Sequence, residues 1–307
     1  MDVYLSLYSG GTIWALNKNI QNDTKLLLSS LKRSKANVWV STPSFADVCL
    51  AEKSFSQELL DDMQCFLFCG ETLTNKTAES LIERFPRAKI FNTYGPTEST
   101  CAVTGVNVDT ELCKTYNPLP VGYVKEGTFI SIENEEHLKL NDGDEGEIVI
   151  TGDSVSPGYF KRDDLNPKSF EKRKVNGTEY RAYHTGDKGY KKNGLLFYSG
   201  RLDFQVKLHG YRIEIEDVES NIMKVNGVVK AAVVPVIRND KVTSLTAFVI
   251  YKDFENGENN FNLAQSIRSQ MKAYVPDYMI PKKIKFITKM PVTNNGKVDR
   301  KSLKEML

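Results

Sequence analysis

Three side chains in a short polar segment, residues 92–98 (NTYGPTE), suit a nucleotide and its metal ion. The ring of Tyr94 can stack on a base, the hydroxyl of Thr97 can bond a phosphate oxygen, and the carboxylate of Glu98 can hold Mg²⁺. The segment follows an expected strand, and ligands of open α/β sheets bind at the carboxyl ends of strands. An ordinary Gly-Pro turn has the same composition, so both interpretations stay open at this point.

Two further segments offer groups that fit a ribose. In residues 183–187 (YHTGD), the carboxylate of Asp187 stands beside a glycine, where backbone can approach a ligand closely. In residues 200–207 (GRLDFQVK), Arg201 is placed to reach a ribose or a phosphate. The alternatives are a Gly-Asp turn between strands and a plain charged linker.

Residues 291–300 (PVTNNGKVDR) place a lysine on an expected loop tip. Asn-Gly forms a tight turn, which would project Lys297 from the loop. A mobile lysine delivered into a cleft can neutralise charge that develops between a carboxylate and a phosphate. The alternative is a lysine that faces solvent and has no role.

The elements that must position these residues begin with an α/β region, residues 1–117. Helical and strand signals alternate there with short connections, as in an open sheet covered by helices. The expected helices are residues 2–8, 25–35, from about 43 onward and 75–85, and the expected strands are residues 12–16, 37–41, 65–68 and 89–91.

Two more regions follow. Residues 118–202 are short β-branched segments divided by Gly, Asn and Asp, which predicts a hairpin-rich β subdomain. Residues 203–307 are expected to form a mobile, compact α+β domain, with Asp203 in a linker as its pivot. Its expected helices are residues 216–225 and 263–274, and its expected strands are residues 228–237 and 245–251.

The amino-acid composition argues against some classes of function for this protein. A formal charge of +2 argues against a broad phosphate-contacting surface for nucleic acid, and no apolar run reaches bilayer-spanning length, so membrane insertion is not expected. Basic residues between 282 and 304 form either a solvated face or a docking surface for an acidic protein. The odd number of cysteines, without a Cys-x-x-Cys pair, favours a reducing cytoplasm. They are Cys49, Cys65, Cys69, Cys101 and Cys113.

The ordered set of segments resembles the adenylate-forming superfamily of acyl-CoA synthetases, luciferases and peptide-synthetase adenylation domains. The fold implied is the carboxyl-terminal part of a large adenylate-forming domain, a helix-covered sheet plus a β subdomain, followed by a small α+β domain. Further agreeing segments are residues 70–71 (GE), 146–148 (GEI), 158–159 (GY), 210–214 (GYRIE) and 278–281 (YMIP). Within the superfamily, residues 42–46 (TPSFA), 66–71 (FLFCGE) and 196–205 (LFYSGRLDFQ) look like the D-alanine–carrier protein ligase family.

That resemblance implies an enzyme that uses ATP and Mg²⁺. It would join D-alanine to ATP as an aminoacyl adenylate, release pyrophosphate, and pass the aminoacyl group to the phosphopantetheine thiol of a D-alanyl carrier protein. The product would serve the D-alanylation of teichoic acids. The alternatives are a peptide-synthetase type of adenylation domain for another small amino acid, and a catalytically incomplete fragment that binds AMP or the carrier.

The resemblance also implies roles for single residues. Asp2 would bind the substrate ammonium, although a helix cap is its other interpretation. Cys69 would line the small side-chain pocket and help to reject the L-enantiomer, and Gly70 and Glu71 would contact adenine or shape its slot.

The remaining roles concern the nucleotide and the carrier thiol. Lys297, Glu98 and Thr97 would be the catalytic residues, with Glu98 as the metal ligand and Lys297 as the bridge between carboxylate and phosphate. The other implied nucleotide contacts are Asn92, Thr93, Tyr94, Asp187 and Arg201, and the residues implied near the thiol channel, after rotation about Asp203, are His209 and Gly210.

One family feature is not found in the sequence. A Ser/Thr/Gly-rich loop that ends in a lysine should precede Asp2, whereas residues 9–12 (SGGT) follow it and lack a following lysine. We therefore expect an amino-terminal truncation, with exposed sheet edges and little activity of this chain alone.

Overall fold

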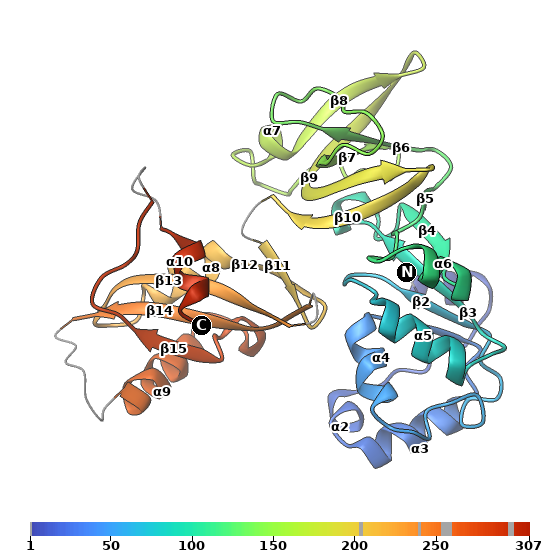
Figure 1. The fold of residues 1–307 in the computed structure, drawn as a ribbon, viewed down its shortest axis with the longest axis horizontal. Helices are drawn as coiled ribbons and strands as arrows, with labels where there is room; N and C mark the ends of the chain where they lie inside the picture. Colours follow the sequence, from blue (N-terminus) through green and yellow to red (C-terminus); the bar gives the residue numbers. More distant parts are fainter. Residues whose placement is uncertain (1, 203–204, 239–240, 253–259, 294–297) are drawn as a thin grey trace. The chain divides into compact units, whose positions relative to one another are not determined.

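The computed structural model describes residues 2–202, 205–238, 241–252, 260–293 and 298–307, apart from the side chains of Asp2 and Leu5. The chain forms two compact units, Met1–Leu202 and Asp203–Leu307, which are coloured in sequence order in Figure 1. Each unit has its own hydrophobic core.

The first part of unit 1 is a five-stranded sheet with its helices. Strands β1, β2 and β3 are parallel, and β4 and β5 continue the sheet in antiparallel fashion. The strands are β1 (Val38–Ser41), β2 (Cys65–Phe68), β3 (Lys89–Tyr94), β4 (Thr104–Asn107) and β5 (Tyr123–Val124). The helices are α1 (Asp2–Tyr8), α2 (Lys18–Gln21), α3 (Thr24–Ser34), α4 (Pro43–Leu50), α5 (Asn75–Arg84) and α6 (Thr110–Thr115), with the 3₁₀ turn η1 (Thr97–Ser99) after β3.

Local chemistry explains where these helices begin. The carboxylate of Asp23 accepts the backbone N–H groups of Lys25 and Leu26 at the start of α3, and the hydroxyl of Thr74 accepts that of Thr77 in α5. Pro43 opens α4, where a missing N–H costs nothing. Apolar residues of these helices and of β1–β3 form one buried cluster, which fixes the sheet.

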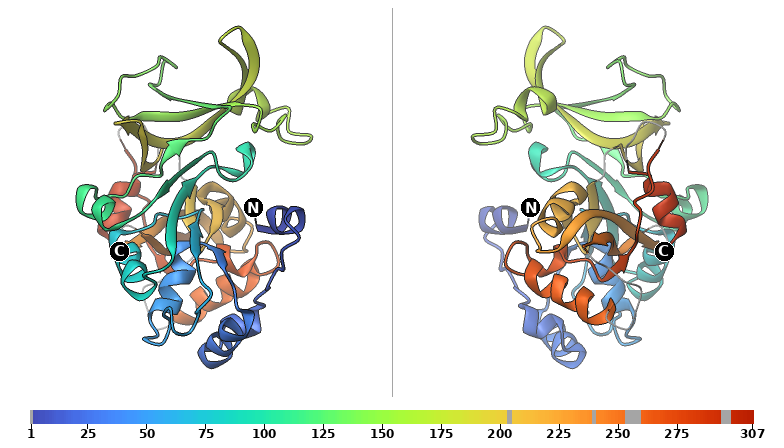
Figure 2. Two further views of the ribbon diagram at one scale, coloured as in Figure 1. Left: turned by 90° about the vertical axis from the view of Figure 1, so that its right-hand side faces the viewer. Right: turned by 90° about the vertical axis from the view of Figure 1, so that its left-hand side faces the viewer.

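The second part of unit 1 is a β sheet in the order β10-β9-β7-β6, with β8 paired to β9. All its pairings are antiparallel, and Figure 2 shows the yellow-green hairpin of β8 and β9 projecting from it. A bridge between Gly122 and Leu196 joins it to the first sheet. The elements are β6 (Thr128–Glu133), β7 (Gly146–Gly152), α7 (Asn166–Ser169), β8 (Phe170–Val175), β9 (Thr178–Lys192) and β10 (Leu195–Arg201).

Unit 2 packs helices against a three-stranded sheet. Strands β13 and β14 are antiparallel, and β15 runs parallel to β14. Arg300, which the sequence groups with a basic surface, instead donates from both terminal guanidinium nitrogens to the carboxylate of Glu219. The elements are β11 (Gln205–Leu208), β12 (Tyr211–Glu214), α8 (Ile215–Ile222), β13 (Val228–Arg238), β14 (Lys241–Tyr251), α9 (Asn260–Met271), η2 (Asp277–Met279), β15 (Lys283–Phe286) and α10 (Arg300–Glu305).

Most expected elements are confirmed to within a few residues, and one is wrong. Residues 12–16 form no strand. Trp14 in this segment is 46% exposed, and its indole N–H donates to the Ser30 hydroxyl at 3.0 Å. Trp14 of this apolar run therefore contacts α3 and not the sheet. An apolar pattern makes a strand possible, but the strand forms only where a neighbouring strand is available to pair with it.

Candidate active site

The carboxylate of Asp187 is the centre of the most buried polar cluster among the predicted site residues. Its Oδ2 accepts the Tyr94 hydroxyl at 2.6 Å, and its Oδ1 accepts Nη1 of Arg201 at 2.8 Å. The side chains of Asp187 and Arg201 are only 3% and 10% exposed. Burial and the neighbouring carboxylate raise the pKa of Tyr94, so its hydroxyl stays a donor.

Strand pairing brings these groups together. Arg201 lies directly opposite Asp187 in the register of β10 and β9, and Tyr94 is the last residue of β3. The site thus forms where the carboxyl end of a parallel strand meets the second sheet, as expected for a ligand site in an α/β fold.

The backbone that carries Asp187 departs from the regular ladder. Val149 of β7 pairs with His184 and Glu147 pairs with Lys188, so Ile148 alone faces the three residues between them. The Thr185 hydroxyl donates to the Ile148 carbonyl at 2.6 Å and accepts the Asp187 N–H at 2.9 Å. This bulge aims Asp187 at Tyr94.

The segment after β3 presents a hydroxyl and a carboxylate in different environments. Thr97 is exposed, whereas Glu98 is only 8% exposed. The Tyr159 hydroxyl donates to Oε1 of Glu98 at 2.5 Å. Gly95 is required here, because a Cβ would lie 2.8 Å from the carbonyl oxygen of Cys101.

The end of β2 carries three further predicted residues. The thiol of Cys69 donates to the carbonyl of Cys101 at 3.4 Å, which ties β2 to the turn after η1. Gly70 follows with a φ of 93°. The carboxylate of Glu71 accepts the N–H of Ser44 at 3.1 Å, in the first turn of α4, where a negative charge is favourable.

The side chains of Asn92 and Thr93 are bonded to backbone carbonyls. Asn92 donates to Pro120 at 2.8 Å in the interior, and Thr93 donates to Phe68 at 2.8 Å. These contacts hold β3 against its neighbours. A direct nucleotide contact of either side chain stays a prediction.

The other predicted residues lie in unit 2 or outside the description. His209 and Gly210 form the exposed turn between β11 and β12. The side chain of Asp2, all of Asp203 and all of Lys297 lie outside the described residues.

Sequence reasoning assigned no role to Tyr159, Tyr183 or Glu147. The hydroxyls of Tyr159 and Tyr183 lie 3.3 Å apart beside Glu98. Burial, with Glu98 and Tyr183 as neighbours, raises the pKa of Tyr159. Glu147 and Tyr159 both lie in segments that resemble the superfamily, and that resemblance was the sequence signal that could have marked them as functional residues.

Comparison with known families defines the class of this protein. Residues 1–160 match the AMP-binding enzyme family, and residues 217–297 match the AMP-binding enzyme C-terminal domain. The first match covers more than half of the chain, and the chain belongs to the AMP-binding enzyme family.

Within this family, the chain is similar to curated ligases of one particular kind. The chain is 48% identical over 303 residues to the D-alanine–D-alanyl carrier protein ligase of Bacillus cytotoxicus, which covers 99% of this chain and 59% of that protein. It is 48% identical over 305 residues to the ligase of the same name from Bacillus licheniformis, covering 99% of this chain and 60% of that protein. The chain thus spans about three fifths of the length of the curated relatives it matches.

Solved structures share the fold. The Vibrio cholerae adenylation domain AlmE, in complex with glycyl-adenosine-5′-phosphate, superposes with a TM-score of 0.82 at 24% identity, over 99% of this chain and 55% of that one. PA1221, a peptide-synthetase protein with adenylation and carrier domains, gives a TM-score of 0.75 at 26% identity, over 93% of this chain and 47% of that one. The predicted fold class and the resemblance to adenylate-forming enzymes are confirmed.

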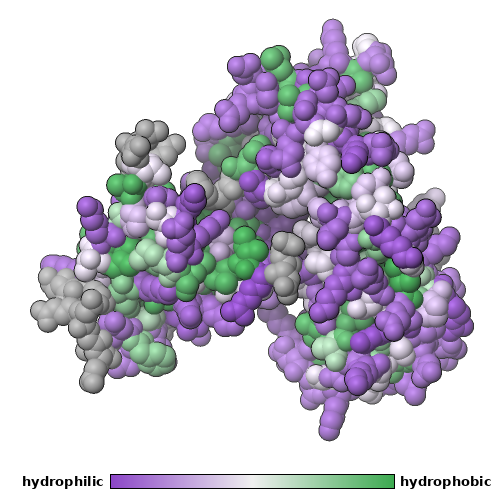
Figure 3. Space-filling model, in the orientation of Figure 1, coloured by the Kyte–Doolittle hydropathy of each residue, from purple (hydrophilic) through white to green (hydrophobic). Residues whose placement is uncertain are grey.

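The surface carries a mixture of side chains. Hydrophilic residues predominate on the face shown in Figure 3, with apolar patches between them. Among the described residues, no helix combines the length and the apolarity that crossing a membrane would require.

Proposed function

We propose that the protein activates D-alanine with ATP and transfers it to the phosphopantetheine thiol of a D-alanyl carrier protein. The 48% identity to ligases of that name along 99% of the chain supports the substrates. The buried cluster of Asp187, Tyr94 and Arg201 is the observation that carries the nucleotide role. The resulting aminoacyl thioester would serve the D-alanylation of teichoic acids in the cell wall.

In the first step, a carboxylate oxygen of D-alanine attacks the α-phosphorus of ATP. A new phosphorus–oxygen bond forms as the bond to pyrophosphate breaks, and the products are D-alanyl adenylate and pyrophosphate. Asp187 would accept hydrogen bonds from the two ribose hydroxyls, because Tyr94 and Arg201 hold its carboxylate in a fixed orientation. Lys297 would neutralise the charge that develops between carboxylate and phosphate.

The residues near η1 fit a magnesium ion. Mg²⁺ prefers hard oxygen donors; Glu98 offers a buried carboxylate, and Thr97, the residue before it in η1, offers a hydroxyl. In its contact with Glu98 the Tyr159 hydroxyl is a neutral donor, not a cation that would compete with the ion for the carboxylate. Glu98 and Thr97 would hold the ion, which when bound would offset the negative charge of the triphosphate.

D-Alanine itself would lie near the end of β2. Cys69 would form one wall of the pocket for the methyl group, since its thiol is fixed by the carbonyl of Cys101. Gly70 and Glu71 would border the adenine, and Asp2 would pair with the substrate ammonium. Crowding at Cys69 would disfavour L-alanine, whose methyl group points the other way.

In the second step, the carrier thiol sulfur attacks the carbonyl carbon of the adenylate. The thioester forms, AMP leaves, and the thiol proton is released. Residues 203–307 would rotate about Asp203 between the steps, bringing His209 and Gly210 to the thiol channel. We place the enzyme in the cytoplasm, because its five cysteines are all free thiols.

Pyrophosphate exchange into ATP tests the proposal. We expect exchange with D-alanine to exceed exchange with L-alanine or glycine, measured on the same preparation with Mg²⁺. A preference for L-alanine or glycine would instead support an adenylation domain for another small amino acid. AMP binding by calorimetry without exchange would identify a binding fragment, and loss of both would reject the nucleotide role.

A further inference from the structure

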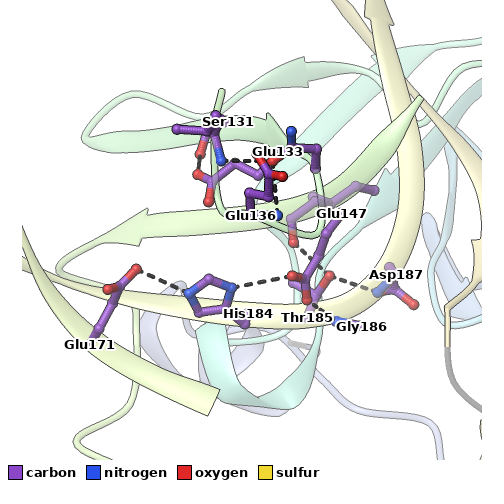
Figure 4. A network of polar contacts seen from close by, with 12 residues as sticks. Ser131, Glu133, Glu136, Glu147, Glu171, His184, Thr185, Gly186 and Asp187 are labelled. Atoms are coloured by element: carbon purple, nitrogen blue, oxygen red, sulfur yellow. Dashed lines mark hydrogen bonds and ion pairs between the residues drawn. The ribbon is translucent and has the colours of Figure 1, made fainter. Parts of the chain in front are cut away.

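A row of polar contacts crosses the second sheet of unit 1 and ends at the segment that carries Asp187 (Figure 4). It runs from Glu171 of β8 through His184 of β9 to Glu147 of β7, and from there to the backbone of Gly186. The row ends on backbone rather than on a side chain of the nucleotide cluster, so its effect must pass through the backbone before Asp187.

The carboxylate of Glu147 accepts a backbone N–H that has no hydrogen-bond partner in the strand ladder. Because β9 bulges opposite Ile148, the N–H of Gly186 has no place in the ladder with β7, and it donates instead to Oε1 of Glu147 at 2.8 Å. Gly186 has a φ of 66°, which favours glycine, so the bulge also depends on this residue. The carboxylate of Glu147 therefore anchors the residue immediately before Asp187.

His184 fixes the other oxygen of the same carboxylate. Its Nδ1 lies 3.2 Å from Oε2 of Glu147, and its Nε2 lies 3.0 Å from Oε1 of Glu171. Both ring nitrogens can donate only when the imidazole is protonated. Hydrogen bonds that the ring donates to the carboxylates of Glu147 and Glu171 raise the pKa of His184, which favours that protonated state.

The other charged and titratable groups around His184 complete this picture. Arg173 of β8 pairs with Glu171 and with Glu133 of β6, and the ring of His137 lies 4.8 Å from that of His184 between centroids. The network therefore sets three carboxylates against the guanidinium of Arg173 and two imidazole rings. When His184 loses its proton, one of its two carboxylates loses its donor, and repulsion among the carboxylates rises.

We infer that Glu147 is a positioning residue for the ribose-binding carboxylate of Asp187, and that protonated His184 holds Glu147 in place. This inference rests on the proposed nucleotide-binding function. It adds to that function a pH-dependent set of contacts that positions Asp187 without touching the nucleotide. The contacts cross three strands, so the support comes from parts of the chain that are far apart in sequence.

The first test compares Glu147→Gln with Glu179→Gln, using AMP binding measured by calorimetry at pH 6.5. The amide introduced by Glu147→Gln keeps the shape of the side chain but loses the charge that holds Gly186 and His184, so we expect AMP to bind about tenfold more weakly. Glu179 lies on the same β8–β9 hairpin in an exposed pair with Lys172, and its replacement should leave binding unchanged.

The second test uses pH. Relative to His184→Asn, whose amide does not titrate, wild-type affinity for AMP should fall as pH rises through the raised pKa of His184. The comparison cancels titration of the AMP phosphate, which is common to both proteins. Parallel pH profiles, or equal AMP affinity of wild type and Glu147→Gln, would overturn the inference while leaving the proposed function intact.

Failure of the proposed function has a different signature. If wild type binds no AMP, the proposed nucleotide-binding function is wrong. Whether Glu147 positions the segment is then tested by hydrogen exchange of the Gly186 and Asp187 amides. We expect exchange at these amides to be at least about tenfold faster in Glu147→Gln than in Glu179→Gln. Equal exchange rates would show that Glu147 does not position this segment.

Discussion

The hydroxyl of Tyr94 lies 2.6 Å from Oδ2 of Asp187, although 93 positions separate the two residues in sequence. One stands at the end of a parallel strand and the other in a bulge of an antiparallel strand. The contact depends on the junction of the two sheets, where the N–H of Val121 donates to the carbonyl of Leu196 at 2.8 Å. Any change that separates the sheets should therefore disturb the nucleotide cluster.

Replacing Tyr94 with Phe should both destabilise unit 1 and weaken AMP binding. The change removes one donor from the buried, charged carboxylate of Asp187, and hydrogen bonds to charged groups contribute about 1.5–3 kcal/mol. Urea unfolding would measure the loss. Tyr123→Phe, at a 56% exposed position, should cost less than about 0.5 kcal/mol. Equal stability of the two variants would contradict the importance of the Tyr94 contact.

Replacing Cys69 with Ala should relax the preference for D-alanine over L-alanine. Removing one small group from a pocket wall changes discrimination by about 1–3 kcal/mol, and the ratio of kcat/KM values in pyrophosphate exchange reports it. Cys65→Ala is the matched control, because Cys65 is the first residue of β2, the strand that Cys69 follows, and it lies away from the turn that Cys69 contacts. Unchanged selectivity in Cys69→Ala would remove this residue from the pocket.

Replacing Lys297 with Ala should largely abolish adenylate formation and spare thioester transfer from preformed D-alanyl adenylate. The lysine is predicted to act on charge that develops only in the first step. Pyrophosphate exchange and single-turnover transfer to the carrier measure the two steps separately. Lys252→Ala, at an exposed lysine of unit 2 outside the basic residues 282–304, should affect neither. Equal losses in both steps would refute the proposed role of Lys297.

The carboxylates around His184 should make the stability of unit 1 depend on pH at acidic values. Although desolvation opposes it, hydrogen bonds from His184 and Arg173 lower the pKa of Glu171, and those from His184 and Gly186 lower the pKa of Glu147. These groups stabilise the fold above their ordinary value of 4.5. Their contribution is lost as pH falls through the lowered pKa values. Urea unfolding between about pH 3 and pH 6 would detect the loss.

His184 should contribute with the opposite sign. Its pKa is raised above 6.5, so its stabilising contribution is fully present below pH 6.5 and is lost as pH rises through the raised value. The measurement is urea unfolding of wild type and His184→Asn over that range. The variant should lack the loss of stability on the alkaline side, and a loss of the same size in both proteins would contradict this assignment.

Local patterns predicted most of the elements because their causes are local. Asp23 caps α3 and Pro43 opens α4, and both signals can be read within a few residues. The failure at residues 12–16 has a physical reason as well. A strand requires a neighbouring strand as hydrogen-bonding partner, whereas the indole N–H of Trp14 donates to the Ser30 hydroxyl on α3.

The sequence by itself determined the order of the chemical groups: the segment from Tyr94 to Glu98, then Asp187 and Arg201. That order is enough to indicate an adenylate-forming enzyme. Only the tertiary structure decided that Arg201 faces Asp187 across β9 and β10, that Tyr159 reaches Glu98, and that Glu147 supports Gly186. The physical reason is strand register. A slip of one residue reverses the face of every side chain, and register depends on bulges and on sheet packing that no short segment encodes.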